Sequence, residues 1–368
     1  MKHGKVSMLI LIVVVGALAF TGSAVAVSPT DAADKALAWL KTQQNDDGGF
    51  GSGFGPGSGA GSTADAILAI TSSGQDASTW TKGGVSPIDY LRAQASADLI
   101  KLPGEIAKTI LALVATGQNP RDFGGRDLIS NLGDQFNAST GLYGRVGDSP
   151  LHSMFDQALA ILALSNAGEP VPDAAVTALL NAQTVEGGWA FTGETIAGAA
   201  DSNTTALATQ ALIAVGRKDD TGRALDYFRR VQNADAGWTY QVPSAFGTDT
   251  DANSTALGIQ AILAAGDSVS NWAKSGGDPI GALLALQNDD GSFSFNAVFP
   301  GPNVLATLQA VPALYGKTFV RVSVVPASGA VPVLLPESGS VLDVWPTLAL
   351  GVLLIFAGIR ARFRVRVL

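Results

Sequence analysis

Apolar and small residues are grouped along the chain in runs that follow two alternating patterns. The runs of the first kind are nearly uncharged, begin at a residue that can cap a helix, and stop at glycine. Capping residues favour helix starts and glycine favours helix ends, so these runs predict six apolar helices. The six runs are Ser62–Gly74, Glu105–Gly117, Asp156–Gly168 and the segments that follow Asp201, Asp251 and Asn303 and end at Gly216, Gly266 and Gly316.

The runs of the second kind lie between the first and are amphipathic. Leu225, Phe228 and Val231, for example, fall on one helix face, while Arg223 and Arg229 fall on the other. An uncharged helix alternating with an amphipathic one predicts two concentric layers, with the uncharged helices inside. The amphipathic runs are Asp31–Gln44, Pro87–Gln94, Arg126–Phe136, Pro172–Gln183, Thr221–Gln232 and Pro279–Gln287.

The two patterns form a repeat, in which Asn203, Asn253 and Asn303 follow one another at intervals of 50 residues. Four amphipathic runs also end in a shared signature. Its glycine permits a tight reversal, its glutamine can satisfy free groups at a neighbouring helix end, and its aromatic residue covers the joint. The four copies are Gln44-x3-Gly48-x-Phe50, Gln183-x3-Gly187-x-Trp189, Gln232-x3-Ala236-x-Trp238 and Gln287-x3-Gly291-x-Phe293.

This signature and the paired helices resemble the Gln-Trp repeats of squalene/hopene cyclases and of protein prenyltransferase β subunits. The resemblance covers about residues 31–317. It implies an all-α fold, an α/α toroid (α6/α6 barrel) of six helical hairpin repeats, occupying residues 27–318 as one domain.

The two ends of the chain have the composition of targeting segments. Residues 1–26 have a basic start, an apolar middle and the ending Ala24-Val25-Ala26, which is typical of a signal peptide. Residues 335–368 contain the apolar run Val344–Ile359, followed by four arginines. The preceding Leu335, Pro336, Glu337, Ser338 and Gly339 resemble the sorting signal of sortase substrates, with serine in place of the usual threonine.

These segments predict an exported protein that is attached to the cell surface. Two attachments stay open, namely linkage to the cell wall by a sortase and a C-terminal membrane helix. Residues 319–334 are expected to form an extended spacer, because they combine prolines and small residues.

The amino-acid composition excludes several kinds of functional site. The chain has no cysteine, which excludes disulfides, thiolate metal sites and a cysteine nucleophile. Residues 27–339 carry a formal charge of −13, because the two ends have net charges of +2 and +3 and the whole chain has −8. So acidic a body argues against nucleic acid as a partner.

The site residues of the resembling enzymes are not retained. Class II terpene cyclases begin an inner helix with Asp-x-Asp-Asp-Thr-Ala, and Asp251-Ala252-Asn253-Ser254-Thr255-Ala256 lines up with it, but Asn253 replaces the proton-donating aspartate. Prenyltransferases bind zinc through aspartate, cysteine and histidine, and His152 is the only histidine after residue 26. We therefore expect no metal site of this kind.

A third resemblance is to the helical domain of secreted cobalamin carriers. Residues 307–317 look like the segment that closes their toroid. Those carriers hold the corrinoid between the toroid and a β domain, for which too few residues remain before Leu335. We expect no bound cofactor, and a corrinoid is the ligand that this resemblance would add.

Five polar residues precede or begin three consecutive apolar helices and would cluster on one rim of a toroid. They are ligand-binding candidates, and N-capping is the alternative role. These residues are Asp201, Asn203, Asp251, Asn253 and Asn303.

Carboxylates facing the cavity are the candidates for general acids. Glu105 and Asp156 lie one turn into their helices, and Asp251 is the first residue of the segment that resembles the cyclase motif. Two functions follow. The first is a non-catalytic module that binds a small, largely apolar ligand or a protein partner, and the second is an enzyme of the terpene-cyclase-like superfamily that uses these carboxylates. The missing acid and zinc ligands favour the first.

Overall fold

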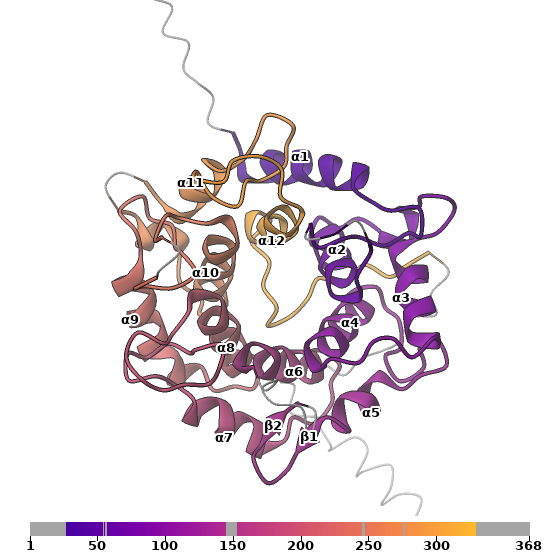
Figure 1. Ribbon diagram of the computed structural model, residues 1–368, viewed down its shortest axis with the longest axis horizontal. Helices are drawn as coiled ribbons and strands as arrows, with labels where there is room; N and C mark the ends of the chain where they lie inside the picture. The colour runs from indigo at the N-terminus through magenta and orange to yellow at the C-terminus, as the bar shows by residue number, and fades with distance from the viewer. Residues whose placement is uncertain are drawn as a thin grey trace, which may run out of the picture.

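The chain forms an α/α toroid, so the predicted fold is confirmed (Figure 1). The computed structural model describes residues 27–328, except residues 54, 56, 145–152, 245–246 and 275–276. The segments predicted as a signal peptide (1–26) and a sorting signal (335–339), and the apolar run 344–359, are outside the described residues. Among the described residues, no helix combines the length and the apolarity that are needed to span a bilayer.

Six helices form the inner ring, and each packs against the next until α12 meets α2. Nearly every residue of these helices is buried, so they have no charged outer face, as the uncharged runs predict. The inner helices are α2 (Ala60–Ser72), α4 (Pro103–Ala115), α6 (Met154–Asn166), α8 (Ser202–Ala214), α10 (Ala252–Ala264) and α12 (Val304–Leu314).

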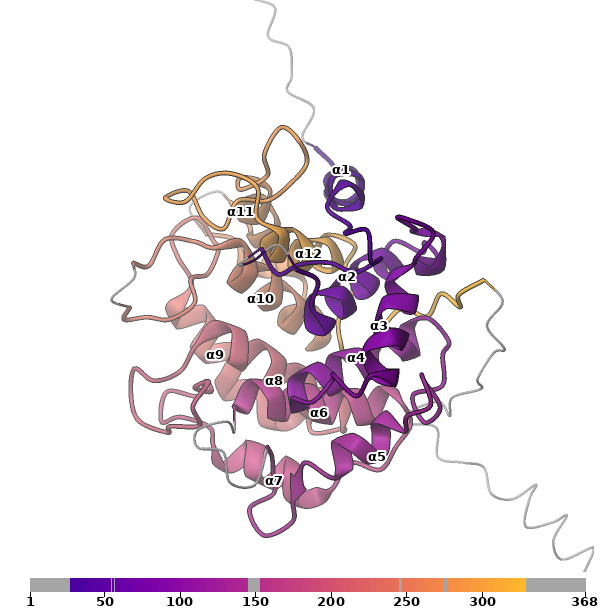
Figure 2. The same ribbon diagram turned by 45° about the vertical axis from the view of Figure 1, so that its right-hand side comes forward.

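Six outer helices surround this ring (Figure 2). Each outer helix packs mainly against the inner helix that precedes it in sequence, and α1 packs against α12. The first helix of the described residues, α1, therefore completes the last hairpin and closes the ring. The outer helices are α1 (Pro29–Thr42), α3 (Pro87–Ser96), α5 (Leu128–Gly133), α7 (Asp173–Asn181), α9 (Gly222–Val231) and α11 (Pro279–Leu284).

Short elements occupy several of the connections. The strands β1 (Phe136–Asn137) and β2 (Leu142–Tyr143) pair antiparallel after α5. The 3₁₀ helices are η1 (Ala77–Thr79), η2 (Lys218–Thr221) and η3 (Val269–Trp272). Because β1 takes up Phe136, α5 is shorter than the run 126–136 predicted.

The repeated glutamine acts as predicted. The amide nitrogen of Gln232 donates to the carbonyl oxygen of Ala236 at 2.9 Å and to that of Trp272 at 2.7 Å. Gln287 makes the same kind of pair across the closure, to Gly291 and to Ala32 in α1. These amides join the end of one repeat to the start of the next.

Neighbouring repeats also satisfy the free N–H groups at the starts of the inner helices. The first N–H of α6, at Met154, donates to the carbonyl of Phe191 at 2.9 Å. Ser202 at the start of α8 donates likewise to Tyr240 at 2.7 Å, and Ala252 at the start of α10 donates to Phe295 at 2.9 Å. The N–H groups that have no partner within their own helix thus form hydrogen bonds between neighbouring repeats of the ring.

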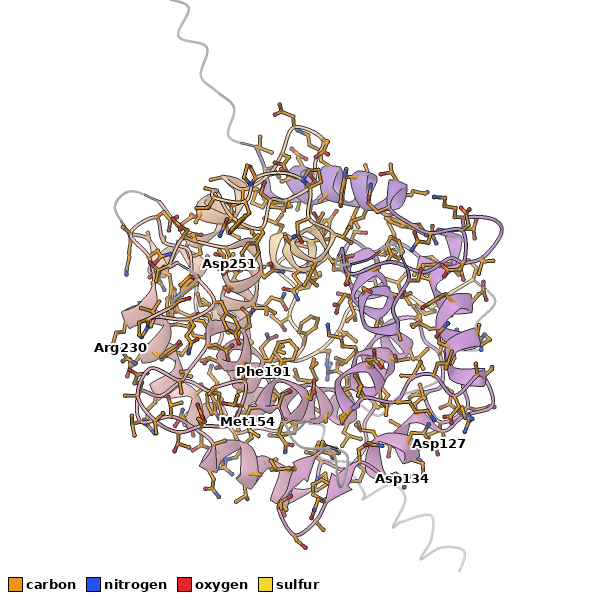
Figure 3. All side chains as sticks on the ribbon, viewed as in Figure 1. Asp127, Asp134, Met154, Phe191, Arg230 and Asp251 are labelled. Carbon is orange, nitrogen blue, oxygen red and sulfur yellow. The ribbon has the colours of Figure 1, made fainter. Side chains whose placement is uncertain are left out.

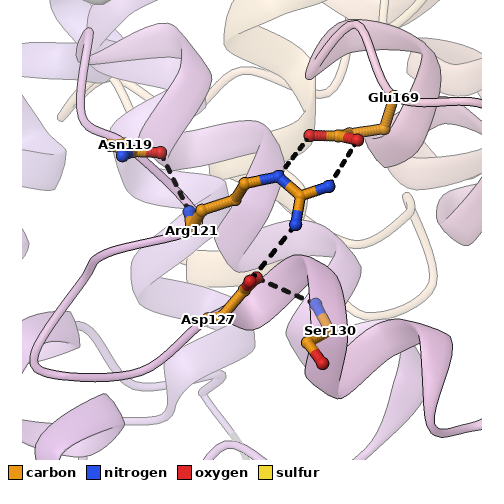
Figure 4. Close-up of polar contacts among 5 residues, drawn as sticks. All are labelled: Asn119, Arg121, Asp127, Ser130 and Glu169. Carbon is orange, nitrogen blue, oxygen red and sulfur yellow. Dashed lines mark hydrogen bonds and ion pairs between the residues drawn. The ribbon is translucent and has the colours of Figure 1, made fainter.

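At the other end of the ring, exposed ion pairs link consecutive repeats (Figure 4). The guanidinium of Arg121 donates to both carboxylate oxygens of Glu169, at 2.7 and 2.6 Å, and to Asp127 at 3.2 Å. Asp127 also caps α5 by accepting from the N–H of Ser130 at 2.9 Å. Bidentate geometry makes this cluster more specific than a single surface pair, although its contribution to stability stays around 1 kcal/mol.

Residues 317–328 cross the end of the toroid where the inner helices terminate; we call this segment the strap. In Figure 1 it is the orange to yellow segment that leaves α12 and passes behind the central opening. Val325 N–H donates to the carbonyl of Ala115 at 2.7 Å, and Ala327 N–H donates to that of Thr116 at 3.0 Å. The packed part of the chain thus continues to Ser328, into the segment where a spacer was expected.

Candidate functional site

The space enclosed by the inner helices, which we call the lumen, is mostly filled by side chains. A cavity of about 20 Å³ remains in it, which is room for a single water molecule. All six inner helices contribute side chains to the lining of this cavity. Phe319 of the strap also lines it, from the end of the toroid where the inner helices terminate. The lining residues are Asp65, Leu68, Lys108, Leu111, Phe155, Leu159, Leu207, Leu257, Gln309 and Phe319.

The lumen contains an ion pair that sequence reasoning missed. The Nζ of Lys108 in α4 lies 2.7 Å from the Oδ2 of Asp65 in α2, and both side chains are largely buried. Lys108 is the only lysine or arginine in the six inner helices. A basic residue in the middle of a run otherwise free of basic residues was therefore the signal in the sequence.

Asp156 lies on the neighbouring helix, close to this pair. Burial raises its pKa, although the hydrogen bond from Ser153 and the charge of Lys108 act in the opposite direction. Its carboxylate lies against the first turn of α4, where a β-carbon on Gly104 would be 2.1 Å from Oδ1. Glycine at position 104 thus makes room for the carboxylate, beside a helix start whose own N-cap, Leu102, offers no side-chain oxygen.

Glu105 has a different environment. It is half-buried in the first turn of α4. Burial and then the charges of Asp47 and Glu105 raise the pKa of Tyr90, which belongs to the outer helix α3. The charge of Glu105 thus acts on the layer between α3 and α4, and its side chain is not among those that line the lumen cavity.

Asp201, Asp251 and Asn303 are N-caps. Asp201 accepts from the N–H of Thr204 at 2.7 Å and Asn303 from that of Ala306 at 2.9 Å. Asp251 accepts from both the N–H and the hydroxyl of Ser254, at 2.7 and 2.8 Å. These hydrogen bonds account for the recurrence of the three residues at one place in the repeat.

Burial has a strong effect on two of these caps. It raises the pKa of Asp201 to about 6, against the lowering effect of the hydrogen bonds from Thr204, Phe191 and Asn203. It raises the pKa of Asp251 to about 6 as well, against the hydrogen bonds from Ser254, Tyr240 and Asn253. Both oxygens of each carboxylate thus already accept a hydrogen bond from the protein, as expected for structural caps.

The two remaining asparagines lie one position into their helices. The amide nitrogen of Asn253 donates to the Oε1 of Gln309 at 2.9 Å, which joins α10 to α12 beside the lumen. The Oδ1 of Asn203, at the equivalent position of α8, is buried and has no hydrogen-bond partner. Asn203 is thus the rim candidate with an unused acceptor.

The connections that lead into the inner helices form one end of the toroid, which we call the N-terminal rim. Ten large hydrophobic side chains are exposed in the described residues, and eight of them lie on these connections. Phe191 extends the apolar lining from the lumen to the rim, because its ring centroid lies 6.4 Å from that of Phe155. Figure 3 shows Phe191 and Met154 at the inner edge of the ring and Arg230 on the outer wall. The eight side chains are Leu99, Leu102, Val185, Phe191, Ile196, Tyr240, Val298 and Phe299.

The structure does not describe the predicted sorting residues or the one histidine after residue 26. His152 and the residues 335–339 are outside the described part of the chain. Within the described residues, no group of three or more histidine, cysteine, aspartate or glutamate side chains could hold a metal ion.

Solved structures similar to this one confirm the toroid but differ widely in activity. A protein from Actinoplanes is 15% identical, with a TM-score of 0.59, and the match covers 78% of this chain and 99% of the other. The type II terpene cyclase MstE from Scytonema is 14% identical, with a TM-score of 0.56, over 78% and 97% of the two chains. An unsaturated glucuronyl hydrolase specific for heparin is 12% identical, with a TM-score of 0.56, over 78% and 96%. At these identities the likeness shows the fold alone.

Sequence comparison is more specific. No curated protein matches the chain. A family model, described as eukaryotic cobalamin-binding protein, matches residues 88–330. The match runs from α3 through all later repeats to the strap and beyond it, so it spans most of the toroid together with the segment that closes it. By this match, the chain belongs to the cobalamin-binding protein family.

Proposed function

We propose that the chain is an exported binding protein that holds a corrinoid against its N-terminal rim. The observation that carries the proposal is the apolar surface of this rim, whose connections expose eight large hydrophobic side chains. The buried Oδ1 of Asn203, at the start of α8 on the same end of the toroid, is an unused acceptor. Large exposed apolar surfaces on soluble domains mark binding sites. Membership in the cobalamin-binding family supports the ligand class.

The structure restricts where a corrinoid would fit. A lumen cavity of about 20 Å³ is far below the roughly 300 Å³ at which ligand pockets begin, so the macrocycle would not lie in the lumen. The exposed apolar side chains favour a place over the N-terminal rim. Corrinoids carry carboxamide groups around the ring, and an amide N–H is the donor that the Oδ1 of Asn203 lacks. Exposed aromatic side chains such as Phe191 and Tyr240 would contact the apolar face of the ring. The other face would stay open to a protein partner.

Attachment to the cell surface through residues 335–368 would leave the N-terminal rim accessible to a ligand. Export would depend on residues 1–26, and attachment on residues 335–368, either through a sortase or as a membrane helix. The strap ends at Ser328, whose N–H donates to Asp76 at 2.8 Å, in the turn after α2. This turn lies at the end of the toroid opposite the N-terminal rim, so an attached chain would present the rim outward.

Titration of the full-length protein with cyanocobalamin tests the proposal. We expect the absorbance of the corrinoid to comigrate with the protein in gel filtration and to saturate at one equivalent. Asn203→Leu should weaken binding about tenfold, which corresponds to one lost hydrogen bond of about 1.4 kcal/mol. Asn119→Leu, at the opposite end of the ring, is the matched control. Absence of comigration, or equal affinity of the two variants, would contradict the proposal.

The alternative function is an enzyme of the terpene-cyclase-like superfamily, and one observation favours it. Asp156 has a raised pKa, lies close to Lys108 and stands near the mouth of an apolar lumen, which suits a proton donor. Glu105 and Asp251 fit this role less well, since Glu105 acts on the outer layer and Asp251 is bonded to its own helix start. Turnover that disappears in Asp156→Asn would establish this alternative.

A further inference from the structure

The deep part of the lumen has an apolar wall formed by a belt of leucines. One leucine comes from each of five inner helices, and all five are buried. The ring of Phe319 occupies the end of this belt nearest the strap, and it is the only lining residue that does not belong to an inner helix. The belt consists of Leu68, Leu111, Leu159, Leu207 and Leu257.

Side-chain carboxamides hold the backbone of the strap at this point. The N–H of Phe319 donates to the Oε1 of Gln210 at 2.8 Å, and its carbonyl accepts from the Nδ2 of Asn166 at 2.9 Å. Asn166 also accepts from the N–H of Val322 at 2.9 Å. An aromatic ring with a peptide group on either side is therefore bound in the lumen much as a ligand would be.

The lumen provides more hydrogen-bonding groups than the strap uses. Gln260 is fully buried, and neither its Nε2 nor its Oε1 has a partner; the Nε2 of Gln210 also lacks one. Gln260 lies 50 residues after Gln210, at the same place in the repeat, and three residues after Leu257, which lines the cavity. This spacing puts its amide on the lumen face of α10. Buried amides without partners are costly, so native proteins rarely keep them unless a water, an ion or another polar group binds there.

We propose that the deep lumen is a second binding site, separate from the rim, which Phe319 occupies as a built-in substitute for a ligand. The ligand class follows from what the site already holds, an aromatic or branched apolar group joined to a neutral amide. The charged groups of the lining do not require a charged ligand, because Lys108 and Asp65 neutralise each other. This inference does not depend on corrinoid binding.

Access requires only part of the strap to withdraw. Residues 317–322 fill the lumen through Phe319 and the hydrogen bonds to Gln210 and Asn166. The rest of the strap has its own attachments, at the carbonyls of Ala115 and Thr116 and at Asp76. The segment around Phe319 can thus leave the lumen while the end of the strap stays in place.

Calorimetric titration of the full-length protein with N-acetyl-L-phenylalanine amide tests the proposal, because this probe reproduces the ring and both peptide groups. Phe319→Ala should bind the probe at least tenfold more tightly than the wild type, in which the strap competes. Phe319→Leu refills the belt and should bind like the wild type. A Phe319→Ala protein with a native circular dichroism spectrum that binds the probe no better than the wild type would overturn the proposal.

A second substitution tests the unpartnered amide. Adding Gln260→Leu to Phe319→Ala should weaken probe binding about tenfold, whereas adding Gln43→Leu, an amide of the outer layer, should leave it unchanged. If Gln260→Leu has no effect, the amide is not part of the site and the inference fails. Cyanocobalamin titrated into the same variants should bind as it does to the wild type, so a failure of the rim proposal would be seen separately.

Discussion

Replacing Asp201 by asparagine tests whether burial or hydrogen bonding controls the charge at the start of α8. Both carboxylate oxygens accept backbone N–H groups, from Thr204 at 2.7 Å and from Phe191 at 2.8 Å. Such donors and the helix dipole lower a carboxyl pKa, whereas removal from water raises it. Burial outweighs the donors here and raises the pKa of Asp201 to about 6.

The magnitude follows from linkage. The unfolded chain ionises near pH 3.9 and the folded one near pH 6, a difference of about two units, or about 3 kcal/mol. Since the folded pKa is the higher one, the folded state binds more protons between these values. This contribution to stability is fully present below about pH 4 and is lost as the pH rises through 6.

Urea denaturation of the wild type and of Asp201→Asn from pH 3.5 to 7.5 measures the effect. Asparagine caps a helix as well as aspartate does, but one N–H loses its acceptor, which lowers stability by about 1–3 kcal/mol at every pH. On top of this constant loss, the variant should gain about 3 kcal/mol relative to the wild type between pH 3.5 and 7.5. Asp278→Asn is the matched control, because Asp278 caps α11 at the surface.

A stability difference that stays constant with pH would refute this reasoning. A difference that changes in the opposite direction would show that the backbone donors and the dipole outweigh burial. In either case ionisation of the buried Asp201 would not destabilise the folded protein. The same conclusion would then apply to Asp251, which is also a buried N-cap.

Two further substitutions test how the repeats are joined, both by urea denaturation. Gln232→Leu leaves two backbone carbonyls without a donor and should lower the free energy of unfolding by about 2–4 kcal/mol, whereas Gln43→Leu at the surface should change it by less than about 0.5 kcal/mol. Gly291→Ala should cost more than Gly316→Ala, although both glycines have positive φ, because a β-carbon at 291 would lie 2.5 Å from the carbonyl oxygen of Lys35. Equal losses in either pair would contradict the proposed role of that contact.

The inner helices could be located from the sequence because local signals define both of their ends. The predicted segment 156–168 corresponds to α6 (Met154–Asn166), since Ser153 and the glycine at 168 mark the limits. The ends of the outer helices were predicted less accurately. The predicted 279–287 ends at Leu284 in α11, because Gln287 is needed in the turn, where it pairs with Phe293.

The rim candidates were found by their position in the repeat, and the repeat also explains why most of them are caps. The interval of 50 residues grouped Asn303 with Asn203 and Asn253, but Asn303 is the N-cap of α12, the position that Asp201 and Asp251 occupy in α8 and α10. The sequence also did not show that the acceptor of Asn203 is unused while that of Asn303 is bonded. The ion pair of Lys108 and Asp65 joins residues 43 positions apart, so only the folded ring shows it. Phe319 belongs to a segment without periodicity, and nothing in its sequence indicated that it enters the lumen.

Because α1 packs against α12, the position at which the toroid domain begins and ends is not fixed by its packing. Contacts of α1 with α11 and α12 replace the covalent connection that the other hairpins have. A chain whose natural ends are joined by a linker and reopened at another turn should therefore assemble the same toroid. It also follows that the ribosome must release α12 before α1 can pack against it, so the ring closes only after nearly the whole domain has been synthesised.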